Sequence, residues 1–298
     1  MPLLTGPHAP WSSFIWDVSR LCLWLVLLTA VFVPLERACA LHPARVLRRG
    51  IWTDLGYYCI NSLLPAALLA VPLAMLATVV HQVVPSGWYS TVQSWPMGGR
   101  MLVGLVVADV GSYWGHRLSH TVPWLWRFHA VHHSAPHMDF LVNTRAHPVD
   151  LVVVRLFGLV PLTLLGLGSA GPQGALLPMV ITLVGTFAGF FVHANVRWRF
   201  GPLEWLVATP AFHHWHHSKI APVNRNYAAT LPCIDRLFGT YHLPAAQWPA
   251  QYGIARDQPE TLGGQLVEPL MALWSRWFPR ARSSEAVGPD AVLAKSVQ

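Results

Sequence analysis

The chain has 298 residues, of which only 11% are charged while 53% are hydrophobic. Soluble domains carry about 25% charged residues, so this composition argues against a water-soluble domain and indicates a membrane protein. The formal net charge of +7 does not indicate a nucleic-acid partner, because the basic residues flank apolar runs instead of forming a continuous stripe.

Five apolar stretches follow one another along the chain. A membrane-crossing helix needs about 20 mostly apolar residues. The candidates are residues 14–34, 55–84, 101–114, 149–167 and 174–192. The last two are joined by GSAGPQG (168–174), whose glycines and proline predict a tight hairpin. These two stretches could therefore form a re-entrant pair instead of crossing fully.

Basic residues are distributed unevenly over the connecting segments. Arg or Lys follows the first, third and fifth stretches, whereas residues 85–99 and 168–174 contain neither. Under the positive-inside rule the N-terminus lies outside and both histidine-rich regions lie in the cytoplasm, as in a bacterial inner-membrane protein. The predicted fold is an all-α integral membrane protein: a helical bundle of four to five transmembrane or re-entrant helices with a cytoplasmic histidine-rich helical cap.

Histidines recur at helical spacing in three places. His116 and His120 are four residues apart, and two later groups repeat the spacing i, i+3, i+4. These groups are His129, His132 and His133, and then His213, His216 and His217. Each spacing puts imidazoles on one face of a helix, and neutral imidazole binds iron, zinc, copper and nickel. Three groups at one membrane face predict a shared metal site.

The motifs HRLSH, HAVHH and HHWHH resemble the three histidine boxes of the fatty acid hydroxylase and sterol desaturase superfamily. The likeness covers about residues 109–241, including DVGSYWGHRLSH and the long stretch TPAFHHWHHSKIAPVNRNYAATLPCIDRLFGTYH. That second stretch is most similar to the alkylglycerol monooxygenase branch and its bacterial relatives. The resemblance implies a membrane-embedded helical bundle with a histidine-ligated pair of iron ions (Fe²⁺/Fe³⁺) that uses O2 to hydroxylate or desaturate a lipid.

The resemblance also gives certain histidines the role of metal ligand. These are His116, His120, His129, His132, His133, His213, His216 and His217, together with His193 at the end of the fifth stretch. For His193 a contact outside the ligand shell is the alternative. Nine imidazoles would give two metals four or five nitrogens each. His214 is expected to point away, and His8, His42, His81, His137 and His242 are expected to be ordinary surface or interface residues.

Other polar residues are expected to support the ligands from a second shell. Asp109, two helical turns before His116, is predicted to accept a hydrogen bond from a ligand imidazole; pairing with a hydroxyl or backbone group is the alternative. Tyr113 faces the same way. His147 in RAHPVD is assigned to the second shell or a channel, with direct metal ligation as the alternative. The matching positions after the last box, with structural or second-shell roles, are Asn224, Asn226, Tyr227 and Asp235.

The chain lacks GxSxG, HExxH and a GxGxxG in a strand–helix context. Electrons are therefore expected from a separate donor, a ferredoxin or a small haem protein. The substrate is expected to be a membrane lipid entering sideways, with hydroxylation favoured over desaturation. A zinc-dependent membrane hydrolase or isomerase at the same histidines is one alternative, since imidazoles also bind zinc and zinc can replace iron on isolation. A non-enzymatic metal transporter is the other.

Three regions are predicted: an N-terminal transmembrane region (1–100), a catalytic region (101–245) and a C-terminal tail (246–298). In the tail, apolar Leu270, Leu273, Trp274 and Trp277 share one helical face. This helix lies on the bilayer surface or packs on the catalytic region, and residues 283–298 are expected to be disordered. The four cysteines are interpreted as small hydrophobic residues and not as a disulfide framework. The N-terminal segment does not resemble a cleaved signal peptide.

Overall fold

The computed structural model describes residues 10–43, 45–167 and 176–277. The helices are α1 (Pro10–Cys39), α2 (Ile51–Val83), α3 (Ser86–Ser94), α4 (Met97–Thr121), α5 (Pro123–His129), α6 (Pro148–Leu164), α7 (Leu176–His193), α8 (Pro210–His216), α9 (Cys233–Leu237) and α10 (Leu262–Trp277). Short 3-10 turns are η1 (His132–Ser134), η2 (Phe140–Thr144) and η3 (Gly201–Trp205). The described residues contain no β-strand beyond two isolated bridges, so the all-α prediction is confirmed.

The predicted apolar stretches fall in α1, α2, α4, α6 and α7. By length and composition, residues 14–39 and 51–80 are long and apolar enough to cross a membrane, and residues 179–193 form a shorter apolar helix. Helix α3 lies in a segment expected to be a loop. The predicted hairpin 168–174, His8 and the tail 283–298 lie outside the described residues.

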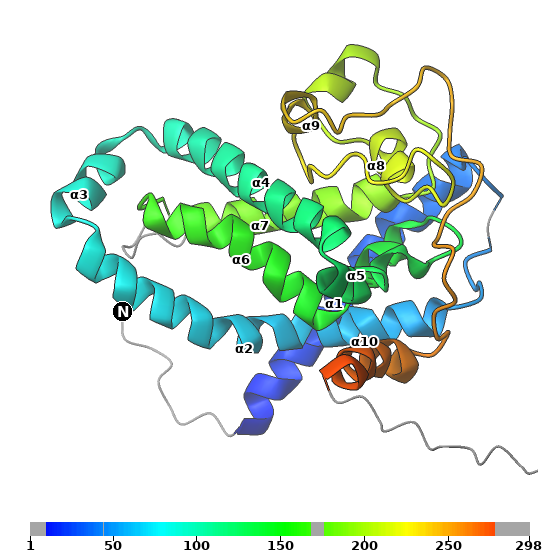
Figure 1. The fold of residues 1–298 in the computed structure, drawn as a ribbon, viewed down its shortest axis with the longest axis horizontal. Coiled ribbons are helices and arrows are strands. Elements are labelled where there is room, and N and C mark those ends of the chain that lie inside the picture. Colours follow the sequence, from blue (N-terminus) through cyan, green and yellow to red (C-terminus); the bar gives the residue numbers. More distant parts are fainter. Residues whose placement is uncertain (1–9, 44, 168–175, 278–298) are drawn as a thin grey trace, which may run out of the picture.

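The long helices meet at one end of the molecule (Figure 1). Helix α2 leads to α3, where the chain turns back into α4, and α6 packs against both α4 and α2. Helices α5, α8 and α9 and the 3-10 turns gather where α4 and α7 end and α6 begins (Figure 1). Histidines far apart in the sequence are therefore brought to the same end of the bundle.

Glycines allow α4 and α6 to pack closely. A Cβ atom added to Gly111 would lie 2.1 Å from the backbone oxygen of Phe157, and one on Gly115 would lie 2.9 Å from the Cβ of Phe157. Small residues at helix crossings permit such backbone approach. This contact holds the C-terminal end of α4, with His116, beside the start of α6.

The end of α1 is tied to the histidine-bearing end by aromatic packing and by one carboxylate. Phe32 stacks on Phe140 of η2 with ring centroids 5.3 Å apart. Glu36 accepts hydrogen bonds from the backbone N–H groups of Phe140 (2.7 Å) and Asn195 (2.9 Å). Because Asn195 follows α7 directly, α1 helps to fix the end of the helix that carries His193.

Helix α10 begins at Leu262, earlier than predicted, and packs on α2 and α5 with Gln265 and Pro269 buried. Its outer face exposes apolar side chains, which are Val267, Leu270, Met271, Trp274 and Trp277. One face of the helix contacts the protein, as the second alternative predicted, while a position on the bilayer surface stays a prediction. The four cysteines are free, and the division into three regions stays a prediction.

We predict that Gly111→Ala disrupts the contact between α4 and α6, because the new methyl group would overlap the Phe157 carbonyl. Overpacking of this kind costs about 1–3 kcal/mol. Gly99→Ala on the same helix, where a Cβ meets no atom within 4 Å, should raise stability by up to about 1 kcal/mol. Thermal unfolding in detergent measures both; equal effects of the two substitutions would contradict the prediction.

Candidate metal centre

Nine histidines converge in two adjoining clusters. The first cluster is His116, His120, His129, His133 and His216. The second cluster is His132, His193, His213 and His217. Within each cluster the potential ligand nitrogens all lie within 4.8 Å of one another. The structure thus brings together all nine histidines predicted from the sequence, and each cluster has the donor atoms to hold one metal ion.

Each HxxHH motif divides its histidines between the clusters. In the motif that begins at His129, the i and i+4 histidines belong to the first cluster and the i+3 histidine to the second. The motif that begins at His213 does the reverse. Residues four apart share a helical face, while the adjacent residue is turned by about 100°. One motif therefore serves two sites, where the sequence suggested that each motif faces one cavity.

The divided motifs also place the two clusters in contact. The rings of His133, in the first cluster, and His217, in the second, stack with centroids 4.3 Å apart. His132, in the second cluster, and His133 meet edge to face at 5.4 Å. Helix α5 ends at His129, and a separate 3-10 turn carries His132 and His133. His129 and His132–His133 therefore lie on separate turns, and together they still contribute to both clusters.

Six of the nine rings direct Nδ1 toward an oxygen atom outside the cluster. The Nδ1 partners are the backbone oxygens of Tyr227 (His116, 2.7 Å), Arg145 (His132, 2.9 Å), Gly189 (His193, 2.7 Å) and Arg225 (His216, 2.8 Å), Asn224 Oδ1 (His120, 3.1 Å) and Asp150 Oδ2 (His129, 2.9 Å). Carbonyl and carboxylate oxygens only accept, so Nδ1 carries the proton. The lone pair of Nε2 then faces the interior of the cluster.

This tautomer leaves lone pairs facing each other inside both clusters. Nε2 of His116 lies 3.1 Å from Nε2 of His129, and Nε2 of His132 lies 3.3 Å from Nε2 of His193. Neither member of a pair has a proton to donate, because Nδ1 holds it. In addition, the buried Nε2 atoms of His120 and His216 have no hydrogen-bond partner. A cation between the rings would satisfy all of these nitrogens, so the residues fit a metal in each cluster.

Burial favours the neutral form of several of these rings, among them His132, His213, His216 and His217. It lowers the pKa of His132 to about 4, further lowered by the nearby His129 and opposed by the hydrogen bond to Arg145. Burial is also the main cause that holds the pKa values of His213, His216 and His217 well below the usual 6.5. Metal ligation requires an unprotonated nitrogen, which these side chains retain at neutral pH.

The carboxylate that contacts a clustered imidazole is Asp150, which the sequence analysis missed. Pro148 starts α6, so Asp150 lies in its first turn, beside His129. For Asp109 the structure shows the alternative stated above: its carboxylate accepts backbone N–H groups of Thr230 (3.1 Å) and Leu231 (2.7 Å), in place of the favoured hydrogen bond from an imidazole. Asp150 is the last residue of the RAHPVD motif, two residues after the proline that starts α6. This motif was the sequence feature that could have predicted the carboxylate.

His147 supports the helix that carries Asp150. Its Nδ1 accepts the Val149 N–H (3.2 Å) at the start of α6, and its Nε2 donates to the Leu266 oxygen of α10 (3.1 Å). It belongs to neither cluster. His214 is fully buried and points away from the clusters, as expected. It lies 3.0 Å from the Tyr252 hydroxyl and 3.1 Å from the Ala194 oxygen.

The remaining polar residues from the family motif hold the loop that covers the first cluster. The Tyr227 oxygen accepts from His116, and the Tyr113 hydroxyl bonds to Thr240 (2.9 Å). Asn226 donates to the backbone oxygen of Phe212 in α8 (2.8 Å). Asp235 accepts the backbone N–H of Tyr227 (2.7 Å). Tyr113, Asn226 and Asp235 act on loop geometry, while Tyr227 and Asn224 contact imidazoles directly.

Comparison with known proteins agrees with this geometry. The model of the family described as fatty acid hydroxylase matches residues 101–240, the segment that carries all nine clustered histidines. The chain is therefore similar to the fatty acid hydroxylase family over residues 101–240. The resemblance stated from the histidine motifs is thereby confirmed.

Three curated relatives have names that describe different reactions. The chain is 37% identical over 197 residues to ornithine lipid hydroxylase OlsE of Rhizobium tropici, covering 65% of this chain and 55% of that protein. It is 30% identical to alkylglycerol monooxygenase of Homo sapiens (45% and 28% covered). It is 28% identical to very-long-chain aldehyde decarbonylase GL1-11 of Oryza sativa subsp. indica (62% and 65% covered). No solved structure matches the chain.

We predict that Asp150→Asn weakens metal binding at the first cluster. The amide cannot fix the His129 tautomer as the carboxylate does, and losing such a partner lowers metal affinity by about 10- to 100-fold. Anaerobic titration of the purified chain with Co²⁺, read by its absorption spectrum, measures this. Asp257→Asn, at an exposed aspartate, is the control; unchanged affinity in Asp150→Asn would contradict the prediction.

We also predict that the metal-free protein loses stability in mild acid. Burial lowers the pKa of His132 to about 4 and that of His214 to about 3. Between about pH 6.5 and 4 the unfolded chain therefore binds protons that the folded chain does not. The free energy of unfolding should fall by about 1 kcal/mol per pH unit for each such histidine. An unfolding midpoint that stays constant from pH 7 to 5 would contradict this.

Proposed function

We propose that this protein is a membrane-bound oxygenase that hydroxylates a lipid, using two iron ions, O2 and electrons from an external donor. The observation that carries the proposal is the pair of adjoining clusters whose neutral imidazoles direct lone pairs inward. This donor set is all nitrogen and suits a transition metal. The names of the relatives, among them a lipid hydroxylase and an alkylglycerol monooxygenase, add support.

In this proposal one iron is held by the first cluster and the other by the second. When bound, the iron pair supplies the redox chemistry that uses O2 to oxidise an unactivated C–H bond. For the six rings whose Nδ1 has an oxygen acceptor, the protein keeps Nε2 free of a proton and directed inward. Asp150 strengthens His129 as a donor, because a carboxylate partner raises imidazole basicity.

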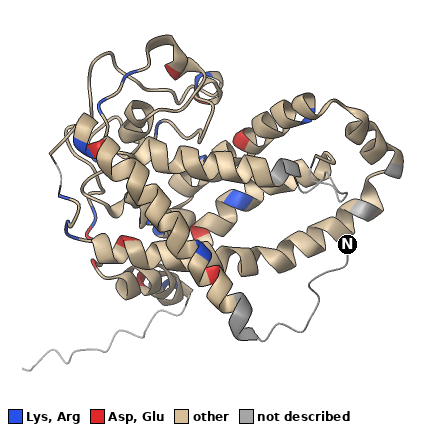
Figure 2. Ribbon diagram, turned by 180° about the vertical axis from the view of Figure 1, so that it is seen from behind, with Lys and Arg blue, Asp and Glu red and all other residues tan. Residues whose placement is uncertain are grey.

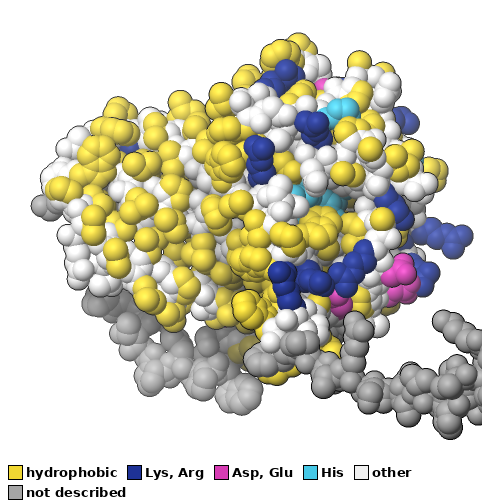
Figure 3. Space-filling view, viewed as in Figure 1, with side chains coloured by type: hydrophobic (Ala, Val, Ile, Leu, Met, Phe, Trp, Pro, Cys, Tyr) yellow, Lys and Arg dark blue, Asp and Glu magenta, His cyan; other side chains and the backbone are white. Residues whose placement is uncertain are grey.

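We further propose that the membrane surrounds the long helices. Exposed apolar side chains cover the part of the surface away from the histidines, and Lys and Arg gather toward the histidine end (Figure 3). Charged residues are sparse along the long helices (Figure 2). In the proposed topology the bundle has four to five transmembrane or re-entrant helices, which come from α1, α2, α4, α6 and α7. The N-terminus lies outside and the clusters lie on the cytoplasmic side of a bacterial inner membrane.

The proposed substrate is a lipid that reaches the clusters sideways from the bilayer. The relatives include hydroxylases, monooxygenases and a decarbonylase, so family membership alone does not fix the reaction. Hydroxylation is proposed because OlsE, a lipid hydroxylase by name, matches at 37% identity. The proposed donor is a ferredoxin or a small haem protein that docks at the basic cytoplasmic end.

We predict that cells producing the wild-type chain contain a lipid class that is heavier by one oxygen atom, measured by comparative lipid mass spectrometry. His132→Ala, which removes a ring from the second cluster, should abolish the modified lipid. His42→Ala, at an exposed histidine outside both clusters, should preserve it. The absence of any altered lipid in the wild type would count against the proposal.

Purified protein distinguishes iron chemistry from a zinc hydrolase or isomerase. Product formation should consume O2 and require a reductant. Anaerobic turnover of a lipid by zinc-loaded protein, without reductant, would replace the proposed function with zinc chemistry. Metal flux into proteoliposomes without lipid modification would favour a transporter.

A further inference from the structure

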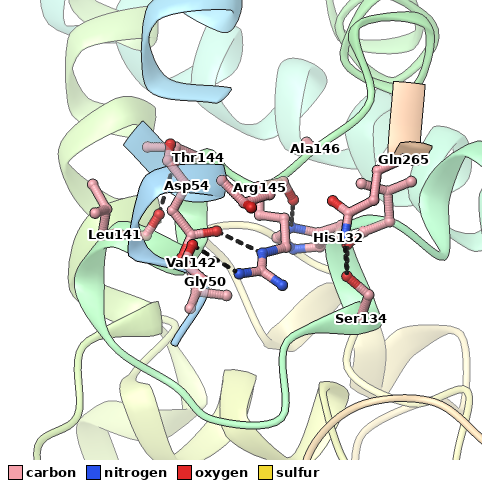
Figure 4. A network of polar contacts seen from close by, with 12 residues as sticks. Gly50, Asp54, His132, Ser134, Leu141, Val142, Thr144, Arg145, Ala146 and Gln265 are labelled. Carbon is pink, nitrogen blue, oxygen red and sulfur yellow. Dashed lines mark hydrogen bonds and ion pairs between the residues drawn. The ribbon is translucent and has the colours of Figure 1, made fainter. Parts of the chain in front are cut away.

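Asp54, in the first turn of α2, is a fully buried carboxylate among arginines. Its Oδ1 lies 2.5 Å from Nε of Arg145, and its Oδ2 lies 2.7 Å from a terminal nitrogen of Arg48. Arg48 also pairs with Asp139. A buried charge is costly unless it is paired and hydrogen-bonded. The network therefore fixes where Arg145 lies relative to α2 (Figure 4).

Helix α2 also holds the backbone on both sides of Arg145. The amide of Asn61 donates to the backbone oxygens of Thr144 (2.9 Å) and Ala146 (2.8 Å). The hydroxyl of Thr144 donates to the backbone oxygen of Asp54 (2.8 Å). The carbonyl between the two held oxygens, that of Arg145, accepts Nδ1–H of His132 at 2.9 Å (Figure 4). Contacts with α2 thus determine where this acceptor lies.

His129 of the first cluster and His132 of the second obtain their outer acceptors in different ways. In the first cluster, His129 bonds to the side chain of Asp150, and both residues lie inside the matched family segment. In the second cluster, His132 bonds to a backbone oxygen that is immobilised by α2, which lies outside residues 101–240. The second cluster therefore depends on the N-terminal part of the chain.

We propose that Asp54 and Asn61 of α2 are positioning residues for the metal held by the second cluster. They act through the Arg145 carbonyl, which orients the His132 ring and keeps its Nδ1 protonated. This role rests on the proposed metal centre, but it concerns how the chain holds a metal and not which reaction follows. Loss of either residue frees the carbonyl and lets the His132 ring rotate out of the cluster.

The test is anaerobic titration of the purified full chain with ⁵⁷Fe²⁺, read by Mössbauer spectroscopy, which distinguishes the two irons. Asp54→Asn keeps the shape of the side chain and removes its charge. We expect the affinity for one iron to fall about 10- to 100-fold, while the affinity for the other stays within about twofold. Asp150→Asn should weaken the opposite iron, because Asp150 contacts the first cluster.

Glu204→Gln is the matched control. Glu204 is a buried acid paired with Arg199 at 2.9 Å, and it belongs to neither cluster. It should lower the unfolding temperature without selecting between the irons. Asn61→Ala is a milder second variant, since it removes no charge, and it should weaken the same iron as Asp54→Asn.

Several results would overturn the inference. One is that Asp54→Asn lowers the affinity for both irons equally, as Glu204→Gln also does. Another is wild-type affinity at both sites in Asp54→Asn or Asn61→Ala. A wild-type chain that binds Zn²⁺ but no Fe²⁺ would refute the proposed function instead. In that case selective loss of one zinc in Asp54→Asn would still support the positioning role, and loss of both or neither would overturn it.

Discussion

The structure of the site depends on one repeated interaction: a buried imidazole donates its Nδ1–H to an oxygen that cannot donate back. This bond fixes the ring, fixes the tautomer and leaves the Nε2 lone pair directed inward. Desolvation keeps the rings neutral, so the inward nitrogens stay available as ligands. Without these oxygens, no hydrogen bond would hold the rings in positions where their Nε2 lone pairs face each other.

Those oxygens come from different parts of the chain, and packing has to bring them to the right place. Close approach of α4 and α6 at Gly111 puts His116 and Asp150 at the same end of the bundle. Glu36 at the end of α1 holds the segment after His193. The long helices thus form a scaffold for the site. The N-terminal helices α1 and α2 hold segments next to clustered histidines, although both helices lie outside the matched family segment.

The two HxxHH motifs illustrate how local geometry creates two sites from one pattern. In each motif the histidines at i and i+4 face one cluster, and the histidine at i+3 faces the other cluster. Because both motifs do this in opposite sense, the clusters share walls and their rings stack. The arrangement of two adjoining clusters follows from this exchange of histidines.

The sequence by itself determined the all-α architecture, the positions of the apolar helices and the identity of all nine clustered histidines. It could do so because helical spacing and apolar runs are local properties. It did not determine the division into two clusters, the contact of Asp150 with His129, or the role of Asp54. Asp109 was predicted to contact an imidazole because it lies on the same helical face as His116. Helical spacing does not predict that the loop with Thr230 and Leu231 packs against this face and donates to Asp109. Only the tertiary structure decides which oxygen meets which imidazole, because those contacts join residues far apart in the chain.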